Sequence, residues 1–300
     1  MHFNNKDEII ALTPQWKGER LPDGRPKVDE RYLKALKTLT LEEVWKPIFV
    51  KGYESQFEGR LYTLHDDGRK LIGRAVTATY CPYRPDLDEV VKDIGRSENR
   101  TGTYNQWVID NLIEYDVPVI DMYDKIYKGT FLGGNLTTAV KKRTKSGGAV
   151  IWGGVRDVEQ MKAVPDVQVY YRGIDPTPIR DFVMTGYNTV TNFGGAVCLP
   201  GDVVFGAGGG VLFIPAHLVA DVVEGAAKTH VKDDFGFEMI GQGKFTTAQI
   251  DRNTWTVEML DMLTKWIKTD PRGEEYRDLD WSKEYDLAIN GDPNDTQTAL

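Results

Sequence analysis

The sequence predicts an α/β fold. Short apolar segments bounded by Gly, Pro or Asp alternate with segments of helical periodicity from about residue 71 to residue 232, and this alternation is typical of α/β domains. Of the 300 residues, 41% are hydrophobic and 27% are charged, which is the balance of a folded chain rather than of a disordered one. The length suits one large domain with extensions or two small domains.

Residues 1–45 are predicted to form an N-terminal extension. The first forty residues are polar and rich in turn-forming Pro and Gly. A helical stretch follows near residues 32–45, where leucines recur at roughly helical spacing and Thr40 with Glu43 resembles a capping box. We expect no chemistry of its own from this extension.

Residues 46–250 are predicted to form the α/β domain. Strands are expected at 75–80, 117–122, 149–152, 167–171, 203–205 and 211–214. Helices are expected at 106–114, 136–145, 158–163 and 217–232. In the last helix the apolar residues form one stripe, which indicates a helix that packs on a core.

Residues 251–300 are predicted to form a C-terminal helix and an arm. After Pro271 the composition shifts to Asp, Glu, Gly and Asn, with Tyr276, Trp281 and Tyr285 among them. This composition indicates an arm that is either solvated or lies on a neighbouring subunit.

Charge and composition exclude several classes of protein. The 45 acidic and 37 basic side chains give a net charge of -8, which argues against a nucleic-acid partner but leaves room for a local anion pocket. Cys81 and Cys198 are too few for a disulfide scaffold and do not sit in a metal-type pair. The four histidines form no HExxH pattern, and no GxSxG elbow is present.

We expect a cytoplasmic protein with no membrane partner. The first ten residues carry charges where a signal peptide has its apolar stretch, although a leader removed earlier would leave no trace in this sequence. The longest uncharged run, 203–220, is interrupted by glycines and by Pro215, so it would make a poor membrane helix.

The first candidate site is the segment 133–138, Gly-Gly-Asn-Leu-Thr-Thr. Two glycines allow close approach of a ligand, and Asn135 is expected to cap the helix that follows. Free amide groups at such a helix start attract a carboxylate or a phosphate. The alternative is a strand-to-helix turn that merely requires glycine, since helix starts of this kind are common.

The second candidate site follows the strand at 149–152. Arg156 and Asp157 come just after it, and ligands of open α/β sheets collect at the carboxyl ends of the strands. The planar fork of Arg156 matches a carboxylate, while Asp157 can hold a hard cation such as magnesium, which needs only one or two carboxylates. Equally, both side chains fit the role of surface charges that open the helix at Val158.

The glycines between residues 205 and 211 predict a hairpin. A dinucleotide-binding loop would need a helix directly after its glycines, whereas the β-rich residues 211–214 follow here. The two cysteines, in apolar or proline-bounded surroundings, are interpreted as packing residues.

Several motifs together resemble the RraA-like family, which includes regulators of ribonuclease E activity and class II 4-hydroxy-4-methyl-2-oxoglutarate aldolases. Its central signature is similar to residues 134–136, 148–150 and 153–157. Further matches lie at 71–77, 117–121, 171–173, 177–178, 200–202, 210–211 and 214–215. The resemblance extends from about residue 71 to residue 243.

This resemblance implies a swivelling β/β/α domain, a homotrimer or hexamer, and sites between subunits. It implies that Mg²⁺ or Mn²⁺ binds a 2-oxo acid substrate, with Asp157 as the metal ligand and Arg156 on the substrate's oxo or carboxylate oxygens. The amides that would hold the pyruvyl carboxylate are those of Gly134, Asn135, Leu136 and Thr137.

The chain departs from the family pattern at three places. Asn135 stands where the aldolases usually have an acid, so general-base assistance is in doubt there. The hairpin reads Ala-Gly-Gly at 207–209 where the family is acidic. An acid expected from the C-terminal part of a neighbouring subunit matches Asp233 or Asp234 only loosely.

The function that the resemblance implies is that of a metal-dependent lyase. It would cleave a C–C bond of a 2-oxo acid by retro-aldol reaction or decarboxylation, through a pyruvate enolate that a cation and a guanidinium stabilise. The alternative is a non-catalytic, protein-binding regulator similar to the ribonuclease E inhibitors. Those regulators tend to lose the aspartate after the arginine, so Asp157 favours the enzyme.

Overall fold

The computed structural model describes residues 3–291. The chain divides into two compact units, Met1–Ala220 and Asp221–Leu300. The boundary between the units, at Ala220 and Asp221, lies inside the segment 46–250 that is predicted as one domain. The domain boundaries expected at residues 45 and 250 stay predictions. The candidate site residues 133–157 all belong to the first unit.

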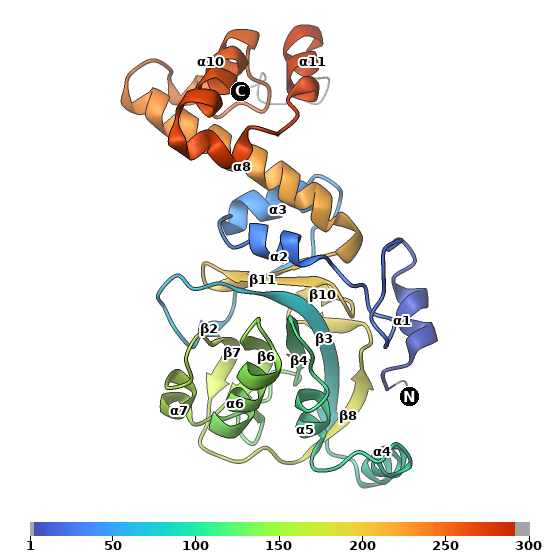
Figure 1. The fold of residues 1–300 in the computed structure, drawn as a ribbon. Helices are drawn as coiled ribbons and strands as arrows, with labels where there is room; N and C mark the ends of the chain where they lie inside the picture. Colours follow the sequence, from blue (N-terminus) through green and yellow to red (C-terminus); the bar gives the residue numbers. More distant parts are fainter. Residues whose placement is uncertain (1–2, 292–300) are drawn as a thin grey trace. The chain divides into compact units, whose positions relative to one another are not determined.

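Four parallel strands form the centre of the first unit. They lie in the order β3 (Leu71–Pro82), β4 (Asp116–Asp121), β6 (Gly148–Val155) and β7 (Gln168–Ile174) (Figure 1). The strands expected at 75–80 and 149–152 lie within β3 and β6. The strand expected at 117–122 is shifted by one residue in β4, and the one expected at 167–171 begins one residue later and extends to Ile174 in β7. Parallel pairing brings the carboxyl ends of these strands to one edge of the sheet.

Antiparallel strands extend this sheet on both sides. The hairpin of β11 (Val203–Ala207) and β12 (Gly210–Ile214) pairs with β3. Gly208 and Gly209 form its two-residue turn with φ of +58° and +83°, the left-handed values that such a turn needs. The predicted hairpin is therefore confirmed. The remaining strands are β1 (Phe57–Glu58), β2 (Tyr62–Thr63), β5 (Thr130–Leu132), β8 (Phe182–Tyr187), β9 (Thr191–Phe193) and β10 (Ala196–Cys198).

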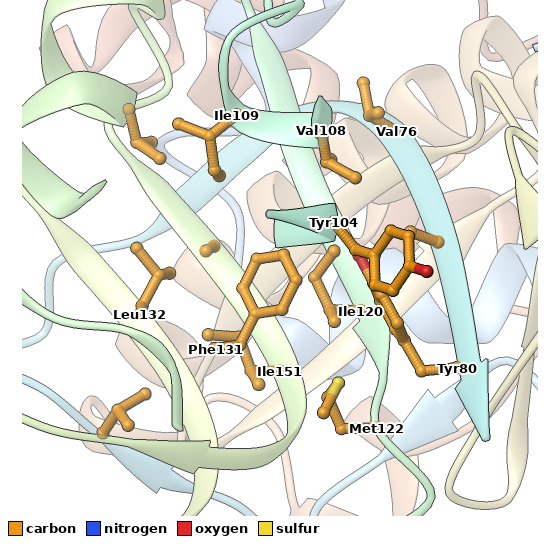
Figure 2. Packing of buried hydrophobic residues seen from close by; sticks show 14 of the residues in the cluster. Val76, Tyr80, Tyr104, Val108, Ile109, Ile120, Met122, Phe131, Leu132 and Ile151 are labelled. Atoms are coloured by element: carbon orange, nitrogen blue, oxygen red, sulfur yellow. The ribbon is translucent and has the colours of Figure 1, made fainter. Parts of the chain in front are cut away.

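Each face of the sheet is buried in its own apolar core. Along β6 the side chain of Ile151 belongs to one core, whereas those of Val150 and Trp152 belong to the other. The helices on the first face are α5 (Tyr104–Ile109), α6 (Gly134–Arg143) and α7 (Val158–Lys162), and Val91 of α4 (Pro85–Ser97) also belongs to this core (Figure 1). Figure 2 shows the packing of this core, with Val108 and Ile109 of α5. Residues of β9, β10 and β12 cover the other face. These three layers confirm the predicted β/β/α fold.

The N-terminal residues form three short helices: α1 (Lys6–Leu12), α2 (Glu30–Ala35) and α3 (Leu41–Phe49). The predicted capping box of α3 is confirmed, because Thr40 and Glu43 exchange hydrogen bonds with each other's backbone amides. The polar helix α4 (Pro85–Ser97) and strand β8 were not expected from the sequence. Only a narrow face of α4 is apolar, with Val91 at its centre.

The second unit is helical and has a separate core. Its elements are α8 (Val219–Gly241), α9 (Thr247–Ile250), α10 (Val257–Thr269), the short helix Pro271–Tyr276 and α11 (Ser282–Asn290). Tyr276 and Trp281 are 9% and 7% exposed and belong to this core. The C-terminal extension expected from the sequence is present, but these two aromatic rings pack on the chain's own helices instead of lying in solvent or on a neighbouring subunit. Residues 292–300 lie outside the described residues.

No helix within residues 3–291 is both long enough and apolar enough to cross a membrane.

A buried ion pair ties the N-terminal residues to the sheet. The guanidinium of Arg25, 2% exposed, donates to both carboxylate oxygens of Asp116 at 2.9 and 3.1 Å, and Asp116 is fully buried. Arg25 also bonds Asp23 at 2.7 Å. Each charge depends on the other, since an unpaired buried charge is expensive.

We expect Arg25→Ala to lower the free energy of unfolding by about 3–5 kcal/mol, because it leaves the Asp116 carboxylate buried without its partner. Urea denaturation measures this loss. Arg31→Ala removes an arginine whose side chain is 71% exposed and serves as the control, with a change below about 0.5 kcal/mol. Equal effects of the two variants would contradict a role for the buried pair.

A second buried carboxyl predicts a pH dependence of stability. Asp202 is 4% exposed, and burial raises its pKa to about 7 although the amides of Leu199 and Ala216 donate to it. The folded protein therefore holds a proton that the unfolded chain releases above about pH 4. The stability of the fold therefore falls as the pH rises from about 4 to about 7, where the folded protein also loses this proton.

We expect Asp202→Asn, which carries no charge at any pH, to gain stability relative to the unchanged protein as the pH rises from 5 to 8. The difference in free energy of unfolding, measured by urea denaturation at each pH, is the quantity to follow. A difference that stays constant over this range would show that Asp202 does not titrate as described.

Candidate functional site

A cavity of about 260 Å³ opens where β5 and β6 end and α6 and α7 begin. We call it the first cavity. Its lining residues come from five segments of the first unit: Thr103, Asn105, Gln106, Thr130, Phe131, Gly133, Asn135, Leu136, Arg156, Asp157, Gln160, Pro178 and Ile179. The two candidate segments, 133–138 and 156–157, thus line the same cavity. This cavity lies at the carboxyl ends of the strands, where the sequence predicts a ligand site.

Arg156 and Asp157 lie side by side in this cavity. Nε of Arg156 is 3.6 Å from Oδ2 of Asp157, and their side chains are 41% and 34% exposed. The backbone of Arg156 is held by its N–H, which donates to the carbonyl of Leu132 at 2.9 Å. A guanidinium and a carboxylate are therefore both available to a ligand in the same space.

The backbone at Asp157 has an unusual conformation. Its φ and ψ are +54° and 38°, in the left-handed region, and it occupies the N-cap position of α7. Aspartate tolerates this region better than most residues, but such conformations still cost energy and are found often at functional sites. The turn points the Asp157 carboxylate back toward Gly133 and Gly134.

Close packing explains the two glycines at the start of α6. A Cβ on Gly133 would lie 2.6 Å from Oδ2 of Asp157, and one on Gly134 would lie 2.5 Å from Oε1 of Gln160. The φ of Gly133, −147°, is open to any residue, so the requirement there is for space. Glycine at 133 lets the strand end approach the Asp157 carboxylate.

The start of α6 differs from the prediction at Asn135. The N-cap is Gly133, and Asn135 lies exposed in the first turn and lines the cavity. The predicted cap is wrong because the helix begins two residues earlier than expected, at Gly134 instead of Leu136. Gly133 has no side chain that could accept from the first-turn amides. Among them, the amide of Gly134 lies 3.4 Å from Oδ2 of Asp157, a long hydrogen bond.

Leu136 and Thr137 have different positions. Leu136 lines the cavity and is partly buried. Thr137 is 1% exposed, and its hydroxyl donates to the carbonyl of Gly133 at 2.9 Å. Its amide also donates to that carbonyl, at 3.0 Å. The hydroxyl and the amide of Thr137 thus both donate within the helix, and the side chain stabilises the helix start.

Sequence reasoning missed several lining residues. Gln160 follows Asp157 by one helical turn, so the helical period after Val158 was the signal that could have found it. Asn105 is 4% exposed and donates to the carbonyl of Phe131 at 3.1 Å. It comes from α5, distant in the sequence, and no local pattern links it to this cavity.

The donor set of the first cavity fits a divalent cation that keeps most of its water. Within residues 3–291, no three His, Cys, Asp or Glu side chains form a metal-type cluster. Asp157 is the one carboxylate among the described lining residues, and Asn135 and Gln160 offer amide oxygens. Magnesium binds through one or two carboxylates and waters, so Asp157 suffices for magnesium but not for a structural zinc site. The contacts of Asp157 with Arg156 and with Gly134 are both made by Oδ2.

The family model of RraA-like proteins, described as Aldolase/RraA, matches residues 48–213. The chain therefore belongs to the RraA-like family. The family includes metal-dependent aldolases and non-catalytic ribonuclease E inhibitors, so membership alone does not resolve the activity.

Protein DlpA of Legionella pneumophila is 29% identical over 177 residues, which cover 55% of this chain and 25% of DlpA. The chain thus spans about a quarter of the length of this curated relative.

Two solved structures share the fold. RraAS2 of Streptomyces coelicolor, described as an unusual member of the RNase ES inhibitor RraA family, is 21% identical with a TM-score of 0.58, over 71% of this chain and 97% of RraAS2. An uncharacterized protein from Pseudomonas syringae pv. tomato is 18% identical with a TM-score of 0.61, over 78% of this chain and 98% of that protein.

We expect Gly133→Ala to displace the Asp157 carboxylate while the protein stays folded. The new methyl group would meet the end of a side chain that can rotate, so the free energy of unfolding should change by less than about 1 kcal/mol. A crystal structure of the variant and urea denaturation measure the two effects.

Gly134→Ala is the matched control, because its methyl group would meet Gln160 instead. An unmoved carboxylate in Gly133→Ala, or equal displacement in both variants, would contradict the steric role assigned to Gly133.

Proposed function

We propose that this protein is a divalent-metal-dependent lyase that cleaves a C–C bond of a 2-oxo acid through a pyruvate enolate. The observation that carries the proposal is the position of Arg156 beside Asp157, 3.6 Å apart, in a cavity that the uncapped start of α6 also lines. One anion site and one cation site are thereby available to the same small molecule.

The carboxylate of the substrate would bind at the start of α6. Gly133 provides no side-chain cap there, and the amide of Gly134 makes only a long hydrogen bond to Asp157. The positive end of the helix favours an anion. Arg156, which is partly exposed in the cavity, would bind the 2-oxo oxygen or a carboxylate oxygen through its planar fork. The guanidinium would then stabilise negative charge as it develops on the enolate oxygen.

Asp157 would hold the divalent cation, Mg²⁺ or Mn²⁺. A cation there supplies Lewis-acid stabilisation of the 2-oxo oxygen when bound. Asn135 and Gln160 can orient water by hydrogen bonds from their amide groups.

Decarboxylation demands less of these residues than retro-aldol cleavage does. In oxaloacetate the bond between C3 and the C4 carboxylate breaks, CO₂ leaves, and its electron pair forms the enolate, which then takes a proton at C3. In the retro-aldol reaction a base must also remove the proton of the C4 hydroxyl. Asn135 cannot accept that proton, so this reaction would need another base or solvent.

The resemblance further supports a homotrimer or hexamer as the working form. Asp233 and Asp234, the candidates for an acid donated by a neighbouring subunit, lie on α8 in the second unit. A carboxylate supplied in this way would provide the base that the first cavity lacks.

We expect pyruvate to form from oxaloacetate in the presence of Mg²⁺, and Asp157→Ala to reduce kcat/KM by about 100- to 1,000-fold. Pyruvate is followed by its reduction in a coupled assay, after subtraction of the rate that Mg²⁺ alone produces. EDTA should abolish the activity. Asp66→Ala, at an exposed aspartate outside the lining residues, should leave the rate unchanged.

Titration with Mg²⁺ and oxalate, an analogue of the enolate, tests binding separately from turnover. The unchanged protein should bind oxalate only with Mg²⁺ present, and Asp157→Ala should lose this binding. If the unchanged protein neither binds oxalate nor forms pyruvate from oxaloacetate or 4-hydroxy-4-methyl-2-oxoglutarate, the non-catalytic regulator becomes the better account.

A further inference from the structure

A second cavity of about 320 Å³ lies beside the first. The two share Thr103 as a lining residue. One segment also passes from one to the other, because Pro178 and Ile179 line the first cavity while Arg180 to Phe182 line the second. All these residues belong to the first unit. A substrate larger than a pyruvyl group could therefore extend from the first cavity toward the second.

Aromatic rings form the wall of the second cavity, which we call the aromatic cavity. Tyr104 makes edge-to-face contacts with Trp107 at 4.9 Å and with Phe182 at 5.7 Å between ring centroids. These three side chains are 6–7% exposed, whereas Tyr83 at the mouth is 48% exposed. Tyr83 is held beside Phe182 by its amide, which donates to the carbonyl of Asp181 at 3.2 Å.

The acidic groups of this cavity already have partners. Asp88 accepts from the Tyr104 hydroxyl at 2.6 Å and pairs with Lys92 at 2.7 Å. Asp181 pairs with Lys128 at 2.9 Å. Among the described residues no carboxylate forms an ion pair with Arg180, which lines the cavity and is exposed. The cavity thus presents ring surfaces and a cation, rather than a free acid.

The three buried rings belong to the core of the first unit and close the space between themselves. Beside them a concavity of about 320 Å³ stays open, lined also by the half-exposed Tyr83 and by Arg180. A cavity of about 150 Å³ is large enough to hold benzene. A half-exposed tyrosine at the mouth is suited to stack on an incoming ring.

We propose that the aromatic cavity binds a ring on the leaving fragment of the substrate, so that the substrate class is a 2-oxo acid with an aryl group at C4. This inference rests on the proposed function, because the pyruvyl end would occupy the first cavity. The rings of Tyr83 and Phe182 select the aryl group, and Arg180 favours a ring that carries a negative substituent.

Two uncleavable ligands test the proposal by calorimetry in the presence of Mg²⁺. Benzoylpyruvate and acetylpyruvate share the 2-oxo acid end and differ only in a phenyl or a methyl group at C4. Neither has the C4 hydroxyl that a retro-aldol reaction requires. We expect benzoylpyruvate to bind about 5- to 10-fold more tightly than acetylpyruvate, from ring contacts and burial of the phenyl group.

Tyr83→Ala should reduce this preference to about twofold or less, and it should leave acetylpyruvate binding unchanged. The exposure of Tyr83 makes misfolding of the variant a small risk, and its thermal unfolding is measured alongside. Tyr62→Ala is the matched control, because Tyr62 is 65% exposed on β2 and lines neither cavity. The control should keep the full preference.

The outcomes separate this inference from the proposed function. If acetylpyruvate binds but benzoylpyruvate binds no more tightly, the aromatic cavity is not a substrate site and the proposed function stands. The same conclusion follows if Tyr83→Ala weakens both ligands equally. If neither ligand binds the unchanged protein, the proposed function fails and this inference fails with it.

Discussion

The close approach of the α6 start to the end of β6 is the constraint on which the candidate site depends. Glycine at 133 leaves room for the Asp157 carboxylate, and a methyl group there would lie 2.6 Å from it. Glycine at this N-cap position also provides no side chain to cap the first-turn amides. A region that binds anions and a carboxylate that binds cations therefore lie together, and opposite charges placed this way suit a 2-oxo acid and its metal ion.

The layered fold supplies the rigidity that this site needs. β6 is buried on both faces, with Ile151 in one core and Val150 in the other, so its carboxyl end has little freedom to move. The left-handed backbone of Asp157 is maintained by this surrounding structure. The Arg25–Asp116 pair anchors the N-terminal residues on β4, the neighbouring parallel strand.

Sequence reasoning predicted the central strands and the Arg156–Asp157 pair because both depend on local order. Apolar runs indicate buried strands. A charged pair directly after a strand lies at the carboxyl end of that strand, whatever the position of the strand in the sheet. It failed at Asn135, whose preference for the cap position was overridden when the helix began at Gly134. It predicted the C-terminal extension but not the burial of Tyr276 and Trp281 within it, because their neighbours in the sequence are polar. Composition records the polarity of a segment, whereas burial depends on the helices that meet it.

The sequence by itself determined the α/β layering, the glycine-bounded start of α6 and the charged pair after β6, because each depends on residues adjacent in the chain. Only the tertiary structure decided that Asn105 and Pro178 line one cavity with Asp157, and that the Thr137 hydroxyl bonds within the helix. Only the tertiary structure brought Tyr83 and Tyr104 to the wall of a neighbouring cavity. Such juxtapositions depend on how distant segments pack against a common sheet, and no local pattern records that distance.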